Sequence, residues 1–339
     1  MLTLVGRRLL SSILVLLLAT GVIFFGVTSI GDPLATLRQR PGVSQQTIDS
    51  IVARKHLDEP GPIQYGYWLR DVVTDGFGTT LLSDQPIWPE LRRALWFTLQ
   101  LVLTAEVIAL VVGVGLGALS AKRQYSALDY STAAVGFLGY SVPIFWFALV
   151  LQVIFTNLFR ATGVRIFYTA GLSSPEAGTG LAFLVDRAQH LALPVIALAY
   201  VHVALYSRYM RASMLEVAAA DYVRTARAKG LRESQITRKH EVRTALIPVV
   251  TLAALHVGAV FSGAIVTETV FSIPGMGSFF IESLQQRDTY QIMAFLVMSA
   301  LFIIGGNLMA DIAYGYLDPR IRQPPTTQGV GGRPPTSRG

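Results

Sequence analysis

Residues Leu95–Ala121 read LWFTLQLVLTAEVIALVVGVGLGALSA, an apolar run with few polar side chains. A helix that rises about 1.5 Å per residue needs roughly 20 apolar residues to cross the hydrocarbon core of a bilayer. The run is long enough for this, and Glu106 is the one ionisable residue in it. It therefore predicts a transmembrane helix.

Five other runs reach the same length, so the sequence predicts about six transmembrane helices. The other five lie at Leu9–Ile30, Ser131–Phe159, Leu191–Met210, Ala245–Val270 and Ile292–Leu317. Composition agrees, because 52% of the residues are hydrophobic and 14% are charged, whereas about a quarter are charged in soluble domains. Arg7 and Arg8 before the first run would also suit a cleaved signal peptide. That run stays apolar for longer and lacks a clear cleavage site, which favours a retained span.

The basic residues predict the orientation of the spans. If the amino terminus is inside, Lys122, Arg123 and the many cations between Arg208 and Arg243 lie on the cytoplasmic side, and the short outer loops carry few. This is the distribution of the positive-inside rule. We expect an all-α membrane protein with both termini inside. The net charge of +7 then reflects topology and gives no reason to expect nucleic-acid binding.

The chain divides into three parts. Residues 1–94 hold the first span and an extracytoplasmic segment in which Ser44 can cap one helix and Pro62 can open another. Residues 95–318 form a transmembrane core with a cytoplasmic loop at 211–244. Residues 319–339 are rich in Pro, Gly, Ser and Thr, which predicts a disordered cytoplasmic tail.

Several classes of chemistry find no support in the sequence. There is no G-x-x-x-x-G-K-[ST] phosphate loop, no H-E-x-x-H zinc motif, no G-x-S-x-G elbow and no cysteine. We therefore expect no catalytic residues, metal site or cofactor in this chain. Gly113, Gly115 and Gly117 lie inside an apolar run, where close helix packing is a better explanation than phosphate binding.

Polar groups inside the predicted spans are candidates for a pathway or gate. Charged groups in hydrocarbon are costly, so they should face the bundle interior. Glu106 could line a pathway, or it could be a hydrogen-bonded group that joins two helices. A short helix at Ser278–Gln286 could fold back against the outer mouth, or the region could be an ordinary interfacial turn. The candidates are Glu106, Gln152, His256, Glu268, Pro274, Gly275 and Gly277.

The cytoplasmic loop carries a recognisable pattern. DYVRTARAKGL at 221–231, followed by His240, Arg243 and Pro248, resembles the coupling region of ABC importer permeases of the dipeptide, oligopeptide and nickel group. The stretches LDEPGPIQYGYWLRDVV, SVPIFWFALVLQVIF, TETVFSIPGMG and LDPRIR also match, so the resemblance runs from about residue 7 to 322. It is greatest to the B-type subunits of dipeptide permeases.

The resemblance implies a type I importer fold in a bacterial plasma (inner) membrane. It implies a heterodimer with a homologous C-type permease, two ATPase subunits that hold ATP and Mg²⁺, and an extracytoplasmic substrate-binding protein. The coupling helix would be about Ala219–Lys229, ending at Gly230. The residues implied in coupling are Asp221, Tyr222, Arg224, Thr225, Ala226, Arg227, Lys229, Gly230, His240 and Arg243.

At two places this sequence differs from the coupling-loop pattern of many relatives, and both differences point to one branch of the family. Arg224 and Thr225 with Ala226 stand where many relatives carry Glu-Ala-Ala, and Arg243 replaces a proline. Both recur in the peptide branch, so the resemblance implies ATP-driven import of peptides, although it leaves the docking contacts open. Nickel chelates, glutathione and haem are the alternative substrates. A secondary transporter would show internal repeats with broken helices, and a membrane enzyme would show a catalytic constellation; the sequence shows neither.

Overall fold

The computed structural model describes residues 2–29, 31, 33–38 and 43–317. Regular structure in this part of the chain is helical, apart from one isolated bridge between Thr79 and Pro86. The helices are α1 (Leu2–Ser29), α2 (Ala35–Arg38), α3 (Gln45–Lys55), α4 (Gly61–Thr74), α5 (Ile87–Lys122), α6 (Ala127–Ser141), α7 (Ile144–Thr162), α8 (Leu181–Ala218), α9 (Asp221–Ala228), α10 (Glu233–Ile236), the π-helical turn η1 (Thr237–Glu241), α11 (Val242–Val270), α12 (Met276–Gln286) and α13 (Thr289–Leu317).

Five helices in the described residues are long and apolar enough to cross a membrane. The candidate segments are Leu10–Ser29, Ile87–Lys122, Ile144–Thr162, Leu181–Ala218 and Thr289–Met309. The remaining predicted span falls in α11, which is helical over Val242–Val270, although some of its side chains are outside the described set. The prediction of an all-α, multi-pass membrane protein is confirmed.

The third predicted span is broken in two. We expected a span over Ser131–Phe159 that could include an interfacial turn; in the structure α6 ends at Ser141 and α7 begins at Ile144. Val142 between them has an extended backbone, with φ −95° and ψ 121°. Pro143 explains the break, because a proline ring disfavours the helical conformation of the residue before it and lacks an N–H for the helix ladder.

The packing of α5 against α8 is the most extensive helix contact in the described residues. A Cβ added at Gly113 would lie 2.7 Å from the Cβ of Tyr206, and one at Gly117 would lie 2.7 Å from the Cβ of Met210. Gly115 has open space around it. The interpretation of this glycine series as a helix-packing surface is therefore confirmed for its first and third members.

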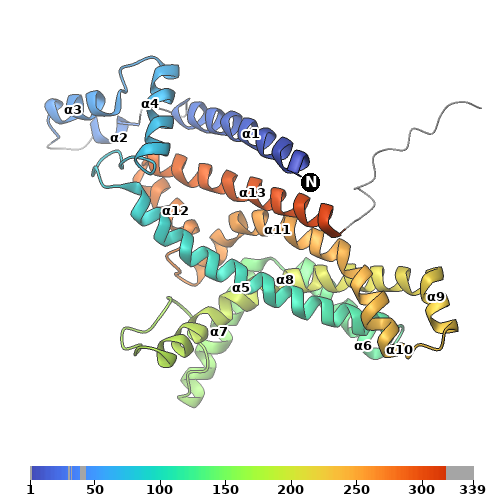
Figure 1. Cartoon of the computed structure of the whole chain (residues 1–339). Helices are drawn as coiled ribbons and strands as arrows, with labels where there is room; N and C mark the ends of the chain where they lie inside the picture. Colours follow the sequence, from blue (N-terminus) through green and yellow to red (C-terminus); the bar gives the residue numbers. More distant parts are fainter. Residues whose placement is uncertain (1, 30, 32, 39–42, 318–339) are drawn as a thin grey trace, which may run out of the picture.

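The small helices gather at the two ends of the bundle (Figure 1). The external segment holds α2, α3 and α4, and Ser44 caps α3 by accepting a hydrogen bond of 3.2 Å from the amide of Thr47, as predicted. Pro62 lies in the first turn of α4, also as predicted. Figure 1 shows α9 and α10 at the opposite end of the bundle. The predicted tail at 319–339 lies outside the described residues.

Candidate functional site

The loop between α8 and α11 contains a short helix of its own, α9 (Asp221–Ala228). Its apolar side chains, Val223 and Ala226, are buried against Ile236 and Val217. Asp221 stands in the first turn, where a negative charge interacts favourably with the helix dipole. A helix is thus present where the coupling helix is expected, and it is fixed to the rest of the loop along one face.

Gly230 ends this helix in a defined way. The amide of Gly230 donates to the carbonyl of Arg227 at 2.9 Å, and that of Leu231 donates to Ala226 at 3.4 Å. This is the Schellman pattern, which needs a left-handed residue after the last helical turn. Gly230 has φ +76°, a conformation that side chains with a Cβ rarely adopt. The chain therefore turns sharply after α9.

Most of the residues implied in coupling lie on the exposed side of this loop. The exposed ones are Asp221, Tyr222, Arg224, Thr225, Arg227, Lys229, Gly230 and Arg243. Ala226 faces inward with 6% of its surface accessible, and His240 is half-buried. The loop therefore presents a basic face at the end of the bundle, and such a face can receive a partner of opposite charge.

A polar cluster crosses the middle of the bundle. Tyr206 on α8 donates its hydroxyl to the Glu106 carboxylate on α5. The Nδ1 atom of His202 lies 3.9 Å from the other carboxylate oxygen, and the rings of His202 and His256 are 5.6 Å apart between centroids. Glu106 is buried, with 6% of its surface accessible. The structure thus places Glu106 and His256 in one cluster, linked through His202, and the Glu106 carboxylate joins two helices.

Tyr206 is absent from the sequence-based candidates. Its hydroxyl faces a carboxylate that lies 100 positions earlier in the chain, and nothing in local spacing indicates that pairing. A tyrosine inside an apolar run was the available signal, because a buried tyrosine hydroxyl usually has a partner.

Gln152 lies away from this cluster. Its side-chain amide donates to the backbone carbonyls of Thr169, at 2.7 Å, and Val270, at 2.8 Å. Thr169 lies in the segment after α7, and Val270 is the last residue of α11. Gln152 thus satisfies a carbonyl that the end of a helix leaves without an intrahelical partner.

Glu268 organises the turn between α11 and α12. Its side chain is inaccessible to solvent, and it accepts hydrogen bonds from the Thr98 hydroxyl at 2.5 Å and from the Gly277 amide at 2.6 Å. Thr98 also accepts from the amide of Met276 at 2.8 Å. These are the free amides of the first turn of α12, so Glu268 and Thr98 together cap that helix from outside its own segment.

Two glycines make room for this carboxylate. A Cβ on Gly275 would overlap the carboxylate of Glu268, and one on Gly277 would lie 2.8 Å from its Oε2 atom. Pro274 precedes them and has no amide that would need a partner. Four of the predicted gate residues therefore meet in one place, beneath the first turn of α12, and the helix expected at Ser278–Gln286 is present as Met276–Gln286.

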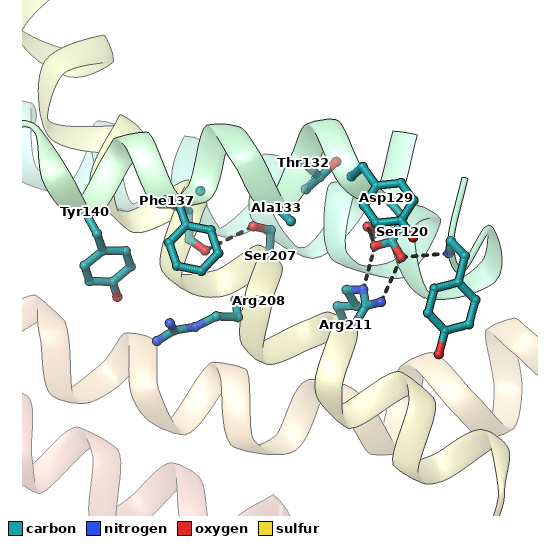
Figure 2. A pocket seen from close by; sticks show the side chains of 13 residues that line it. Ser120, Asp129, Thr132, Ala133, Phe137, Tyr140, Ser207, Arg208 and Arg211 are labelled. Carbon is teal, nitrogen blue, oxygen red and sulfur yellow. Dashed lines mark hydrogen bonds and ion pairs between the residues drawn. The ribbon is translucent and has the colours of Figure 1, made fainter. Parts of the chain in front are cut away.

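A cavity of about 600 Å³ lies between α6 and α8 (Figure 2). At one end Asp129 accepts two hydrogen bonds from Arg211, at 2.6 and 2.8 Å, and one from Ser120 at 2.6 Å. These bonds hold the pKa of the Asp129 carboxyl well below its ordinary value. At the other end Arg208 stacks over the ring of Tyr140, 5.3 Å from its centroid. Sequence reasoning did not single out these residues.

Within the described residues, no group of three or more His, Asp or Glu side chains is arranged to hold a metal ion.

Comparison with protein families matches residues 113–323 to the family described as "Binding-protein-dependent transport system inner membrane component". The oligopeptide transport system permease protein AppB of Bacillus subtilis (strain 168) is 38% identical over 93% of this chain and 98% of its own length. The dipeptide transport system permease protein DppB of Escherichia coli (strain K12) is 34% identical, over 86% and 90%.

The oligopeptide transport system permease protein OppB of Mycobacterium tuberculosis (strain ATCC 25618 / H37Rv) is 36% identical over 94% of this chain and 98% of its own length. A solved structure titled "Crystal structure of an amino acid ABC transporter with histidines" aligns with a TM-score of 0.49 and 14% identity, over 67% of this chain and 94% of that one.

Proposed function

The chain belongs to the family of binding-protein-dependent transport system inner membrane components, and on that premise we propose that it is a permease subunit of an ATP-driven importer of peptides. The observation that carries the proposal is its similarity, at 34–38% identity over most of its length, to permeases of dipeptide and oligopeptide transport systems. The substrate would cross between this chain and a second, homologous permease of the C type.

The energy for import would come from other subunits. Sequence motifs for nucleotide binding are missing from this chain, so ATP and Mg²⁺ would be held by two ATPase subunits on the cytoplasmic side of a bacterial plasma membrane. An extracytoplasmic binding protein would deliver the peptide from outside. The external segment around α2–α4, at the opposite end of the bundle from α9 (Figure 1), is the surface we assign to that contact.

The coupling helix α9 supports this division of labour. ATP-driven closure of two soluble domains can move membrane helices only through a stiff connection, because a flexible loop would absorb the motion. α9 has a buried apolar face, a defined end at Gly230 and an exposed basic face. These properties suit a rigid element that lies in an acidic groove of an ATPase.

The proposal is tested in proteoliposomes that contain the complete complex, supplied with its binding protein. Labelled dipeptides and tetrapeptides should accumulate with ATP inside, and accumulation should stop when the ATPase partners carry inactive phosphate loops. Uptake that persists without ATP hydrolysis would refute the ATP-driven mechanism. Accumulation of a nickel chelate, glutathione or haem in place of both peptides would refute the peptide substrate and leave the importer assignment standing.

The role of α9 has its own test. Arg224→Glu reverses an exposed charge, since the Arg224 side chain is 70% accessible, and Gly230→Pro removes the left-handed turn. Both variants should insert normally and hydrolyse ATP with little uptake. Arg160→Glu is a matched control, because Arg160 is exposed at the end of α7, far from the loop. Normal peptide uptake by both loop variants would remove the coupling assignment.

A further inference from the structure

Glu241 is a carboxylate buried within the cytoplasmic loop. It is the last residue of the π-helical turn η1 (Thr237–Glu241), and none of its surface is accessible to solvent. Its neighbours Arg238 and Lys239 are exposed. A π-helical turn changes the direction in which successive side chains point, and such turns occur frequently at functional sites. Here the turn directs an acidic side chain inward from a basic loop.

Two cations from distant elements meet this carboxylate. The Nζ atom of Lys122, the last residue of α5, is 2.8 Å from the Oε2 atom of Glu241. An Nη atom of Arg227, on α9, is 3.1 Å from the Oε1 atom and donates a hydrogen bond to it. Each carboxylate oxygen thus faces its own cation. A buried charge is tolerated when it is paired in this way.

Arg227 extends the network. Its Nε atom donates to Glu233 of α10 at 2.8 Å, and an Nη atom reaches the carbonyl of Ala218, the last residue of α8, at 3.5 Å. Lys122 lies 3.8 Å from Glu233 as well. Two cations and two carboxylates therefore connect α9 with α10, with the end of α5, with the end of α8 and, through Glu241, with the start of α11.

Among the described residues, the apolar cluster of α9 includes residues of α8 and α10 and none of α5 or α11. Val223 and Ala226 pack on Ile236 of α10 and on Val217 of α8. In the described part of the chain, α9 is linked to the end of α5 through two carboxylates that both contact Arg227 and Lys122: the buried Glu241 and the exposed Glu233, which lies 3.8 Å from Lys122. Removing the negative charge of Glu241 leaves the exposed Glu233 as the carboxylate that Arg227 and Lys122 share, so one change would loosen α9 from α11 and weaken its link to α5.

α5 and α11, which meet at Glu241, also hold α12 at the other end of the bundle. Thr98 belongs to α5 and Glu268 to α11, and both bind the first turn of α12. Glu241 precedes the first residue of α11, and Lys122 is the last residue of α5. A displacement of α9 that reaches Glu241 thus acts on the inner ends of both helices that hold the first turn of α12.

We propose that Glu241 is a positioning residue, which with Lys122 and Arg227 forms an ionic joint that transmits movement of α9 to α5 and α11. The inference rests on the proposed function, because it assigns α9 the role of receiving the motion of the ATPases. Glu241 touches neither substrate nor nucleotide; it acts through the two cations that it holds.

The test uses the complete reconstituted complex with Glu241→Gln, which keeps the size of the side chain and removes its charge. Peptide imported per ATP hydrolysed should fall at least tenfold, while ATP hydrolysis and the amount of assembled complex stay near wild type. Glu216→Gln is the matched control, because Glu216 is exposed in the last turns of α8; its ratio should equal that of wild type. Lys122→Gln, which removes one of the two cations, should also lower the ratio of import to hydrolysis. The double variant Lys122→Glu with Glu241→Lys exchanges the two charges and should partly restore that ratio.

Two results would overturn the inference. The first is a wild-type ratio of import to hydrolysis in Glu241→Gln. The second is a fall in both rates in proportion to a smaller amount of complex, with an unchanged ratio, which would mean that the ionic cluster only stabilises the loop.

A second readout separates this inference from the peptide assignment. ATP should change the hydrogen exchange of α12 in the wild-type complex, and Glu241→Gln should abolish that response whether or not a peptide is imported. A wild-type complex that shows the response but imports no peptide would refute the substrate alone. A response that survives in Glu241→Gln would refute the ionic joint.

Discussion

Gly117→Ala should weaken the packing of α5 against α8. The added Cβ would lie 2.7 Å from the Cβ of Met210 and closer still to the carbonyl oxygen of Ser207. Ordinary van der Waals contact begins near 3.4 Å and the Ser207 oxygen would be the atom nearest to the added Cβ, so the two helices would have to separate locally by about 1 Å. Neither neighbouring atom can move by rotation of a side chain, because one is a Cβ and the other belongs to the backbone.

The size of the effect follows from comparison with Gly115→Ala. Overpacking of a closely packed site costs about 1–3 kcal/mol, and replacing glycine by alanine within a helix gains up to about 1 kcal/mol. Gly115 has no atom within 4 Å of an added Cβ, so Gly115→Ala should have the gain in helix stability without an overpacking cost. The gain is common to both variants, and their difference therefore isolates the overpacking cost of about 1–3 kcal/mol.

The assay is the unfolding of each purified variant in the same detergent, followed by the loss of the folded peak in size-exclusion chromatography as denaturant increases. Gly117→Ala should unfold at a lower denaturant concentration than wild type, and Gly115→Ala should match or exceed wild type. Equal stability of the two variants would refute the assignment of Gly117 to the helix contact.

Three further changes have defined outcomes. Glu268→Ala should lower the hydrogen-exchange protection of the first turn of α12, because the amides there lose their acceptor, whereas Thr269→Val, at an exposed neighbouring position, should not; equal protection in both would contradict the capping role. The hydrogen bond from Arg227 lowers the pKa of Glu233 from its ordinary value of 4.5. The stabilisation from that contact is therefore complete above pH 4.5 and is lost as the pH falls through the lowered value. The amides of α9 should lose hydrogen-exchange protection on acidification of the wild-type protein. If a Glu233→Gln variant lost as much protection on acidification, titration of Glu233 would not be the cause. Gly230→Ala should destabilise the last turn of α9 by about 1–2 kcal/mol, because φ is +76° there; the exchange protection of that turn measures it, and unchanged protection would contradict the reasoning.

The long apolar runs could be predicted from the sequence because each satisfies a length requirement that is set by the bilayer. The end of α9 at Gly230 could be predicted for a similar reason, since a glycine after a run of helix formers is a strong local signal. Ser44 at the start of α3 is a third local case. In each of these, the residues that decide the structure lie within a few positions of one another.

The sequence allowed an interfacial turn in the third span but did not give its position. Pro143 follows Val142 within an apolar run, and the run alone favours a continuous span. The length of α8 was underestimated because its end segments are not hydrophobic enough to be recognised as part of a span. The helix extends over Leu181–Ala218 instead of Leu191–Met210, and its end segments are more polar than the predicted span, although His190 and Met214 in them are buried by tertiary packing.

The partners of the buried carboxylates could not be predicted. Glu241 and Lys122 are far apart in sequence, and the π-helical turn that directs Glu241 inward has no composition by which it could be recognised. Glu268 was selected as a polar group in a span, but its pairing with Thr98 joins positions 170 residues apart. Such pairings depend on helix packing, which a single sequence does not specify.

Besides Asp129, which binds Ser120, three buried carboxylates among the described residues lie on α5 or bind it, at different depths. Glu268 binds Thr98 near the outer end of α5, Glu106 on α5 itself binds α8 in the middle, and Glu241 binds Lys122 at the inner end. Each of these carboxylates would be costly to bury without a partner, and each has a hydrogen-bonding or ionic partner on another element. These contacts tie α5 to α8 and α11 near both of its ends and at its centre. If the ionic joint at Glu241 acts as proposed, movement of the inner end of α5 is passed to its outer end, beneath α12.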